Sequence, residues 1–336
     1  MFDRSPGIGL DIGSKKIKIA QVKKTKQGIK VIGFDSMDTP PGMVEAGNFV
    51  DPAGLGAELG KLVGKLRLKN HKVVSAVAGQ QVYTRNIVMP RMKLGELKEA
   101  ITFQAINFLP IPVEEAAIDI FPLRDFEDDE GKKTEVFFVA VRRQQVENLD
   151  MVCKAAGLNL VAVEIEPLAA NRVLGRNNPE EVSAYLNIGG SRSHFSVFKK
   201  NILVFYRSMS FGCSAFYEAM ALNSPDGNGN PEDINFGQGS IYDYLTRDII
   251  DEVTRSVEYY NLQSSMSEGQ IEKIWLCGSG SRFSGLDESL AAGSGLEVEI
   301  ADPLRELILP ANLSQEQELD LKYDYLIALG LAARLK

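Results

Sequence analysis

The stretch Gly9-Leu10-Asp11-Ile12-Gly13-Ser14-Lys15-Lys16 decides how this chain is interpreted, because a related stretch recurs about half a chain later. The second copy reads Tyr185-Leu186-Asn187-Ile188-Gly189-Gly190-Ser191-Arg192. When the copies are aligned, they share Leu, an Asp or Asn, Ile and Gly at matching positions, and Lys23-Lys24 aligns with Lys199-Lys200. Each copy is an apolar strand that runs into a glycine turn, so the sequence predicts an internal duplication.

Each copy has the chemistry of a phosphate-binding turn. The glycine lets the backbone approach an anion closely, and the N–H groups that follow it point into the concave side of the turn. Asp11 and Asn187 suit Mg²⁺ that is held through its water ligands. Either copy alone could be an ordinary β-hairpin, but two copies in register favour a nucleotide site. The predicted phosphate contacts are Gly13, Ser14, Lys15 and Lys16, and Gly189, Gly190, Ser191 and Arg192.

Composition limits the classes of function. The 336 residues are enough for two core-sized domains or one bilobed molecule. Apolar residues make up 44% and charged residues 24%, which is typical of a globular protein and argues against disorder. The net charge of -8 argues against a general nucleic-acid binder.

One segment departs from this acidic balance. Seven lysines lie between Lys15 and Lys30, and no acid occurs between Asp11 and Asp35. A solvated strand face is the simpler explanation, and a surface for phosphate or anionic lipid is the alternative.

Cysteine and histidine usage argues against a zinc site or a Cys-His nucleophile. Cys153, Cys213 and Cys277 lack metal or redox spacing, and an odd number of cysteines predicts no disulfide framework, so a reducing cytoplasm fits best. His71 and His194 are far apart in sequence, and we expect structural roles for both.

The sequence predicts no membrane-spanning segment. Met1-Phe2-Asp3-Arg4 leads into a polar start without the apolar core of a signal peptide. The longest apolar run, Val136 to Val141, is far shorter than the roughly 20 residues that span a bilayer. We therefore expect membrane contact to be peripheral or through a partner.

Hydrophobic periodicity predicts the same three-strand unit twice, at residues 8–12, 17–22 and 29–34 and again at 184–188, 194–198 and 202–209. A helix capped by Asp51 continues to Leu68, and a buried strand follows at residues 73–78. After the second unit we expect a surface loop at 223–239, a helix at 242–262, a strand at 271–277, a short helix at 283–292 and a final helix at 319–335. That final helix is predicted to face the core rather than a membrane surface.

The segment from about residue 84 to 153 has a different pattern of predicted elements from the two repeats and is predicted to be an inserted subdomain. Its expected elements are a helix at 96–109 stopped by Pro110, strands at 117–123 and 135–141, and a helix at 144–156 capped by Gly157. The acidic stretch 125–131 is predicted to be an exposed hairpin loop and not a metal site.

A third glycine cluster, Gly278-Ser279-Gly280-Ser281, follows an apolar strand and precedes a helix. It is either a plain strand-to-helix turn or a place where backbone packs against a ribose and purine. Two phosphate turns followed by such a turn give an order that resembles the actin, Hsp70 and sugar-kinase superfamily. Glu166-Pro167-Leu168-Ala169-Ala170 is similar to the start of the Hsp70 interdomain helix, which implies that Glu166 lies near Mg²⁺ and the attacking water. The alternative is that Glu166 only complements the helix dipole.

Further segments are similar to the type IV pilus assembly protein PilM family. They are Phe103 to Ala116, with its Leu109-Pro110-Ile111-Pro112-Val113-Glu114-Glu115 core, Ala156 to Glu166, and Arg255-Ser256-Val257-Glu258-Tyr259-Tyr260. With the glycine motifs they cover nearly the whole chain. The resemblance implies an α/β, actin-like bilobed fold of two RNase H-like βββαβα domains with an inserted α+β subdomain in the first lobe. The implied subdomains are a first core (1–83, 154–183 and the helix 319–336), the insert (84–153), a second core (184–210 and 269–318) and a lid over the nucleotide (211–268).

The resemblance also implies function. It implies a cytoplasmic scaffold at the inner membrane that binds ATP or ADP with Mg²⁺ and captures the N-terminal cytoplasmic peptide of PilN, and through it PilO and the pilus motor platform. The peptide groove would lie between the first core and the insert, with Phe108, Leu109 and Ile111 as candidates, unless these residues belong to the core of the insert. Self-association is left open. We expect no nucleic acid as a partner, and no membrane contact except through a partner.

The chain departs from the superfamily pattern at Asn187, where Asp is usual. An amide can accept a hydrogen bond from a Mg²⁺-bound water but supplies no charge, which weakens metal binding by up to a few kcal/mol at an effective dielectric near 20. We therefore predict nucleotide binding with little ATPase activity, in which Asp11 and Glu166 are the candidate catalytic residues. Glu252 and Arg255 are the candidate contacts to the adenine.

Two alternatives remain from the sequence. A sugar or metabolite kinase of the same superfamily would need a general base for a hydroxyl, and no Asp in a kinase signature is evident. An FtsA-like polymerising protein would need a linker and a membrane helix after the last predicted helix, which the residues up to Lys336 do not supply.

Overall fold

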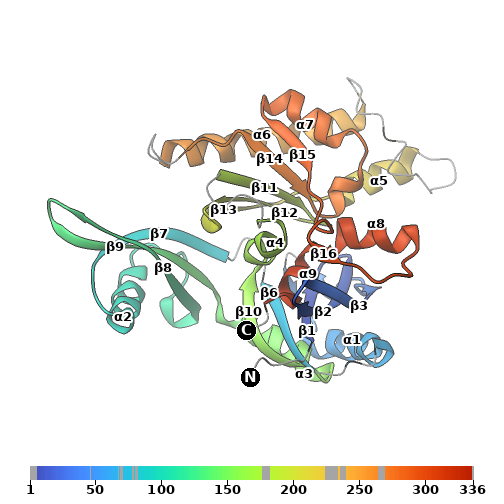
Figure 1. Ribbon diagram of the computed structural model, residues 1–336, viewed down its shortest axis with the longest axis horizontal. Coiled ribbons are helices and arrows are strands. Elements are labelled where there is room, and N and C mark those ends of the chain that lie inside the picture. The colour runs from blue at the N-terminus through green and yellow to red at the C-terminus, as the bar shows by residue number, and fades with distance from the viewer. Residues whose placement is uncertain are drawn as a thin grey trace.

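The fold consists of two lobes, each built on one β-sheet, with helices between and around the sheets (Figure 1). It was obtained as a computed structural model. The structure describes residues 6–45, 47–66, 68, 71–77, 79, 82–175, 182–223, 234, 240–263 and 269–334. The predicted loop at 223–239 lies almost entirely outside these residues.

The first sheet has the order β10-β6-β1-β2-β3-β16. Strands β1, β2 and β3 form an antiparallel meander, while β6 is parallel to β1, β10 is parallel to β6, and β16 is parallel to β3. The bounds are β1 Gly7–Ile12, β2 Lys16–Thr25, β3 Gly28–Asp38, β6 Lys72–Val77, β10 Asn159–Ile165 and β16 Leu307–Ile308. A small hairpin of β4 Val44–Glu45 and β5 Asn48–Phe49 follows β3.

The second sheet repeats this plan in the order β13-β12-β11-β14-β15. Strands β11, β12 and β13 form the antiparallel meander, and β14 and β15 continue in parallel. The bounds are β11 Val182–Ile188, β12 Ser193–Lys199, β13 Ile202–Met209, β14 Lys273–Cys277 and β15 Glu297–Ile300. The predicted duplication of a three-strand unit is therefore confirmed.

The insert is a separate three-stranded antiparallel sheet, β7-β9-β8, that carries a helix on one face. Its elements are β7 Val82–Pro90, α2 Leu94–Ala105, a 3₁₀ turn at Val113–Glu115, β8 Ala116–Asp128 and β9 Gly131–Arg142. In Figure 1 the β8–β9 hairpin extends to the left of the two lobes.

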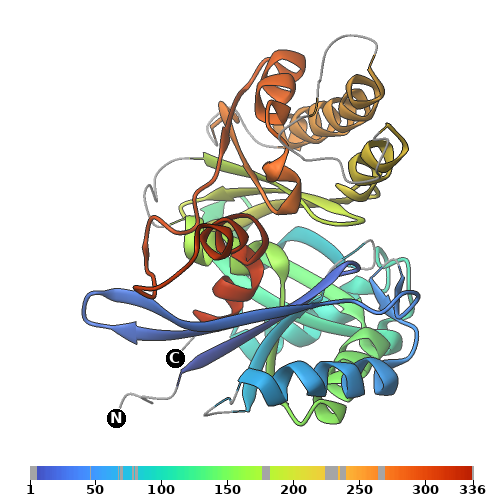
Figure 2. The same ribbon diagram turned by 90° about the vertical axis from the view of Figure 1, so that its right-hand side faces the viewer.

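Helices α4 and α9 lie between the two sheets (Figures 1 and 2). Helix α4, Glu166–Leu174, packs on α9, Leu326–Ala332, and also approaches β12 and β13. The outer face of the first sheet is covered by α1, Pro52–Leu66, and α3, Arg143–Ala155. The second sheet is covered by α5 Ser214–Asn223, α6 Ile241–Gln263 and α7 Leu286–Ser294.

The predicted helix ends have local causes. Asp51 Oδ1 accepts a hydrogen bond from the N–H of Gly54 at 2.9 Å, which satisfies an end group of α1. At the end of α3, Gly157 adopts φ +73°, and the N–H of Leu158 donates to the carbonyl of Cys153. That left-handed position favours glycine, as the sequence predicted.

Three predictions of secondary structure were wrong in detail. The final helix is two helices, α8 Gln315–Asp324 and α9, separated at Tyr325, and all seven residues of α9 are buried. The predicted helix 96–109 ends at Ala105, before Pro110. The acidic stretch 125–131 is mostly strand with only a short turn, because β8 and β9 stay paired as far as Asp128 and Gly131. Strand β7 was missed by the sequence analysis.

Two glycines bring α9 close to its neighbours. A Cβ on Gly9 of β1 would lie 2.0 Å from the carbonyl oxygen of Ala328, and one on Gly330 would lie 2.0 Å from the carbonyl oxygen of Ala169 in α4. Both obstacles are backbone atoms, so a side chain could be accommodated only by displacing α9. This close packing sets the spacing of β1, α9 and α4.

Replacing Gly330 by Ala should therefore destabilise the protein although Ala is the better helix former. We expect the free energy of unfolding to fall by about 1–3 kcal/mol or more, as for other overpacked cores. Gly64→Ala in α1 is the matched control, because a Cβ there meets nothing within 4 Å. That change should stabilise the protein by about 0.5–1 kcal/mol. Urea unfolding of both variants checks the opposite signs, and equal signs would contradict the packing argument.

Candidate functional site

The two glycine turns have the same geometry. The N–H of Gly13 donates to the carbonyl of Lys16 at 3.0 Å, and the N–H of Gly189 donates to the carbonyl of Arg192 at 2.9 Å. Each turn is also tied to the chain after the third strand of its sheet. Thr39 Oγ1 donates to the carbonyl of Gly13 at 2.7 Å, as Ser214 Oγ does to that of Gly190. The duplication therefore includes the turns and their supports.

The two turns meet at the junction of the lobes. A Cβ on Gly190 would lie 2.9 Å from Cγ of Lys15 and 3.3 Å from Oγ of Ser14. The N–H groups of Ser14 and Lys15, and those of Gly190 and Ser191, donate to no described residue. Four backbone donors are thus available where the turns converge, which is the chemistry that anionic oxygens require.

The third turn packs against the second. Gly278 has φ +83°, and a Cβ there would lie 2.1 Å from Oδ1 of Asn187, so only glycine permits this approach. A Cβ on Gly280 would overlap the side chain of Ile188. Residues Ser279–Arg282 form a 3₁₀ turn that brings the predicted adenosine turn to the end of β11.

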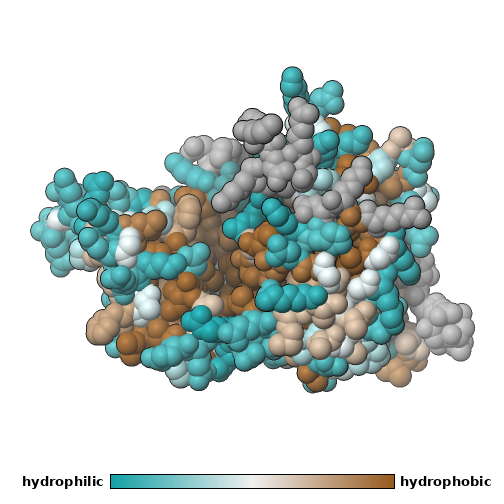
Figure 3. All heavy atoms as spheres, turned by 90° about the horizontal axis from the view of Figure 1, so that it is seen from below, coloured by the Kyte–Doolittle hydropathy of each residue, from teal (hydrophilic) through white to brown (hydrophobic). Residues whose placement is uncertain are grey.

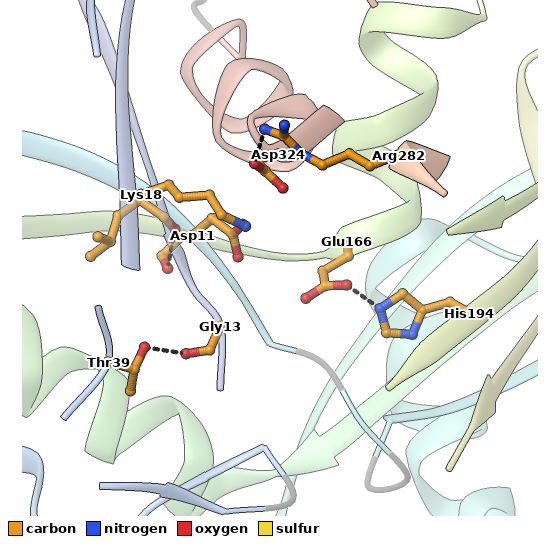
Figure 4. Close-up of polar contacts among 10 residues, drawn as sticks. Asp11, Gly13, Lys18, Thr39, Glu166, His194, Arg282 and Asp324 are labelled. Carbon is orange, nitrogen blue, oxygen red and sulfur yellow. Dashed lines mark hydrogen bonds and ion pairs between the residues drawn. The ribbon is translucent and has the colours of Figure 1, made fainter. Parts of the chain in front are cut away.

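Buried charges connect the lobes beside these turns (Figure 4). Lys18 Nζ lies 3.3 Å from Oδ2 of Asp11, and Nε2 of His194 contacts Oε2 of Glu166. Asp11 and Lys18 come from the first sheet, Glu166 begins α4, and His194 lies on β12 directly opposite Asn187. The predicted site residues Asp11, Glu166 and Asn187 are thus brought to one region.

The carboxyls of Asp11 and Glu166 are shifted in opposite directions. Burial raises the pKa of Asp11, and the charge of Glu166 adds to this rise against the opposing effect of Lys18. Burial also acts to raise the pKa of Glu166, but the charge and hydrogen bond of His194, together with Lys18, hold it below its ordinary value. Asp11 is therefore the carboxyl that would gain most from a nearby divalent cation.

A second ion-pair group closes the site from the C-terminal segment. Arg282, at the end of the third turn, lies 2.5 Å from Asp320 and 2.6 Å from Asp324 of α8. Burial acts to raise the pKa of Asp324, but Arg282 and Lys18 outweigh it and lower that pKa. The third turn is thereby fixed to the first lobe.

Nδ1 of His194 and Nη1 of Arg192 are buried and have no hydrogen-bond partner among the described residues. Because buried polar atoms are normally hydrogen-bonded, Nη1 of Arg192 is a donor available to a ligand oxygen or to water, and Nδ1 of His194 can donate or accept according to its tautomer. The residues present therefore fit a nucleotide phosphate with Mg²⁺, in which Asp11 and Asn187 would hold the metal through its waters. Within the described part of the chain, no three His, Cys, Asp or Glu side chains are grouped to bind a metal directly.

The structure does not bring Glu252 and Arg255 to the turns. Glu252 pairs with Arg207 of β13 at 2.8 Å and with Arg255 at 2.9 Å. Arg207 lines a hollow between the second lobe and the insert, away from the third turn. A contact of these two residues with adenine stays a prediction.

The insert and β13 enclose two adjoining hollows. The smaller, of about 350 Å³, is lined by Arg85, Phe108, Leu109, Tyr206 and other residues. The larger, of about 1240 Å³, lies between β7–β9 and β13 with Tyr259 and Tyr260 of α6. Seen from below, the molecule is hollowed beside the insert, and hydrophobic residues dominate the visible walls (Figure 3). Phe108 and Leu109 thus line a hollow, whereas Ile111 is buried in the core of the insert.

Four residues of this region were not predicted from the sequence as part of the site: Lys18, His194, Arg282 and Asp324. The spacing from Asp11 to Lys18 equals the spacing from Asn187 to His194. Extending the aligned repeat would therefore have placed Lys18 and His194 at equivalent positions. His194 was expected to be structural, and it contacts the candidate catalytic residue Glu166. Asp324 has no local signal, because only the packing of α8 places it beside Arg282.

These features define the class of the protein as a bilobed actin-like α/β fold, as expected from the sequence. A structure described as "PilM-PilN type IV pilus biogenesis complex" matches with a TM-score of 0.84 and 26% identity, and covers 98% of both chains. The ethanolamine utilization protein EutJ from Carboxydothermus hydrogenoformans matches with a TM-score of 0.54 and 16% identity over 99% of this chain and 92% of that one. MreB5 of Spiroplasma citri bound to ADP matches with a TM-score of 0.53 and 13% identity, over 89% of this chain and 92% of that one.

The family model for type IV pilus assembly protein PilM matches residues 9–336. The chain therefore belongs to the PilM family. None of the helices described in the structure is both long and apolar enough to cross a membrane.

Removing His194 should expose the cost of burying Glu166. Without that partner, burial is left as the largest influence and the pKa of Glu166 rises. A raised folded-state pKa lowers stability at neutral pH, and the loss disappears as the pH falls and Glu166 becomes protonated. We expect His194→Ala to cost about 3–5 kcal/mol at neutral pH and distinctly less in mild acid.

Urea unfolding at both pH values checks this expectation. The control is His71→Ala, whose exposed ring should change stability by less than about 0.5 kcal/mol. Adding Glu166→Gln to His194→Ala should restore much of the loss at neutral pH. If His194→Ala lowered the free energy of unfolding equally at both pH values, the buried charge of Glu166 would not be the cause of the loss.

Proposed function

We propose that this protein is a nucleotide-binding adaptor of the type IV pilus inner-membrane platform. The observation that carries the nucleotide part is the meeting of the two glycine turns, which offers four N–H groups that donate to no described residue. Backbone donors of this kind bind phosphate without a dedicated side chain. Membership of the PilM family supports the pilus part.

In this proposal Ser14, Lys15, Gly190 and Ser191 bind the phosphates of ATP or ADP. Asp11 and Asn187 hold Mg²⁺ through its waters, and Gly278 to Ser281 border the adenosine. When bound, the metal would neutralise part of the phosphate charge. Lys18 and His194 keep the two buried carboxylates oriented from equivalent strand positions, which supports a preorganised site.

We expect binding to exceed hydrolysis. Phosphoryl transfer by this kind of site depends on position and charge, and Asn187 supplies no charge. The nucleotide would instead favour one arrangement of the lobes, because it contacts turns from both.

The hollows beside the insert support an extended peptide as the second ligand. They are bordered by β7 and β13, which are the edge strands of their sheets among the described residues. An edge strand offers unpaired backbone groups to an added strand, and aromatic walls offer pockets for alternate side chains. By analogy with the PilM-PilN complex, the peptide is the N-terminal cytoplasmic tail of a PilN-type protein.

This tail would place the protein at the cytoplasmic face of the inner membrane. Links to PilO and to the pilus motor would then be indirect. The hollows are closed by β13 of the second lobe. A groove between the first core and the insert, which the family resemblance implied, stays a prediction. A change in the distance between lobes would alter the groove, which couples the nucleotide site to the peptide.

Calorimetric titration with Mg-ATP tests the nucleotide site. We expect the wild type to bind, and Asp11→Ala and Gly13→Val to weaken binding by about tenfold or more. A Cβ on Gly13 would lie 2.9 Å from the carbonyl oxygen of Lys16 and distort the turn. Lys61→Ala on the exposed face of α1 is the control. Absence of heat with the wild type, or equal binding by the variants, would refute the site.

Titration with the PilN-type peptide tests the groove. Arg85 lies 4.9 Å above the Phe108 ring and lines both hollows, so Arg85→Ala should weaken binding by about tenfold, as for a central interface residue. Arg91→Ala, which removes only a surface pair with Asp125, should leave the affinity unchanged. Equal losses in both variants would place the peptide elsewhere. Because Arg85 belongs to the insert and to neither glycine turn, failure of this titration can be told apart from failure of the titration with Mg-ATP.

A further inference from the structure

Strands β2 and β3 extend past the end of the first sheet. Strand β1 begins at Gly7, which is opposite Val22, whereas β2 continues to Thr25. Beyond that point, Lys23 to Lys30 form a two-stranded ribbon, which β16 contacts only at Ile29 and Lys30. In Figure 2 the hairpin is the blue ribbon that projects beyond the body of the molecule. We call the segment Lys23–Lys30 the basic ribbon.

Lysines cover the basic ribbon on both faces. Lys23, Lys24, Lys26 and Lys30 are exposed, and none of them forms an ion pair with a described residue. Lys23 lies directly opposite Lys30. Two like charges in a cross-strand pair are destabilising, so this arrangement has a cost that the fold alone does not explain.

The tip is held in one conformation. Thr25 Oγ1 donates to the carbonyl of Gly28 at 2.9 Å and accepts from the N–H of Gln27 at 3.2 Å. Gly28 has φ +138°, which a side chain rarely adopts. The turn therefore presents Lys26 at a fixed position between the two strands.

The neighbouring elements that the structure describes do not neutralise this charge. The preceding residues of β16 are Arg305 and Glu306, both exposed, and the carbonyl oxygen of Glu306 lies 4.0 Å from a Cβ on Gly28. Glu306 makes no ion pair with the four lysines, and Arg305 adds a positive charge. The basic ribbon is thus a local positive surface on a chain of net charge -8.

We propose that the basic ribbon binds the surface of an anionic lipid bilayer. Ile29, the apolar residue within the basic ribbon, is buried, as are Val22 and Val31 beside it. Ile32 is exposed but lies outside the ribbon, so the ribbon itself carries charge without an apolar anchor. Lys23 and Lys24 are successive exposed residues of β2 and so lie on opposite faces of the hairpin. Charge on both faces suits the diffuse charge of a lipid surface better than a shaped protein pocket. Lysine, a compact point charge, suits headgroups that need no bidentate geometry.

The expected strength is modest. Each lysine near an anionic bilayer favours binding about fivefold, so four lysines together contribute on the order of a thousandfold. Such binding is screened by salt, since it is electrostatic. It would orient a protein that a peptide tail already holds near the membrane. The proposal does not rest on the nucleotide site or on the peptide groove.

Co-sedimentation of the full chain with vesicles tests the proposal. Vesicles of phosphatidylcholine with phosphatidylglycerol are compared with vesicles of phosphatidylcholine alone, at low and high salt. The test variant changes Lys23, Lys24, Lys26 and Lys30 to Gln. The matched control changes Lys61, Lys98, Lys132 and Lys154 to Gln, so both variants lose the same net charge. Circular dichroism confirms that each is folded.

We expect the wild type and the control to bind the anionic vesicles with affinities within about twofold of each other, and the basic-ribbon variant to lose at least about tenfold. Binding should vanish on neutral vesicles and in high salt. Equal loss in both quadruple variants would attribute binding to net charge and overturn the proposal, as would no binding by the wild type. If sedimentation velocity instead showed self-association that only the basic-ribbon variant lost, the basic ribbon would bind a second copy, and the lipid proposal would fail.

Discussion

The close approach of α9 to β1 and α4 is the constraint on which the rest of the structure depends. It requires no side chain at Gly9 and Gly330, where a Cβ would overlap backbone atoms. Because α4 lies between the sheets, its distance from β1 also sets the distance between the lobes. Glu166, the first residue of α4, is thereby held where His194 of the other sheet can reach it. The geometry of the site is a consequence of this packing.

The two sheets are copies whose differences coincide with the proposed functions. Asp11 and Lys18 of the first sheet have Asn187 and His194 as their equivalents in the second. The carboxylate at the proposed metal position is therefore present in one lobe, and an uncharged amide takes its place in the other. At the sheet edges, β16 covers β3, while the hollow beside the insert borders the equivalent strand β13. Duplication supplied both the symmetric turns and an open edge.

Much of the fold could be predicted from the sequence, and what could not be predicted depends on contacts between distant residues. The duplicated strands, the caps at Asp51 and Gly157, and the buried character of the last helix are local properties and were confirmed. The break at Tyr325 was missed, because the apolar pattern runs through it. Strand β7 was missed since its burial depends on pairing with β9, which is distant in sequence. Lys18 and His194 could have been predicted by extending the aligned repeat, because they occupy equivalent positions in its two copies. Arg282 and Asp324 lie outside the repeat, and no sequence pattern pairs them.

The sequence by itself determined the fold class, the positions of the two glycine turns and the family, because strand periodicity, glycine positions and short motifs act over a few residues. Only the tertiary structure decided that the two turns touch at Gly190, that His194 lies on Glu166, and that the hollow beside the insert is closed by the second lobe. These relations join residues that are between about 28 and 176 positions apart, and they follow from helix packing and lobe spacing rather than from local propensity.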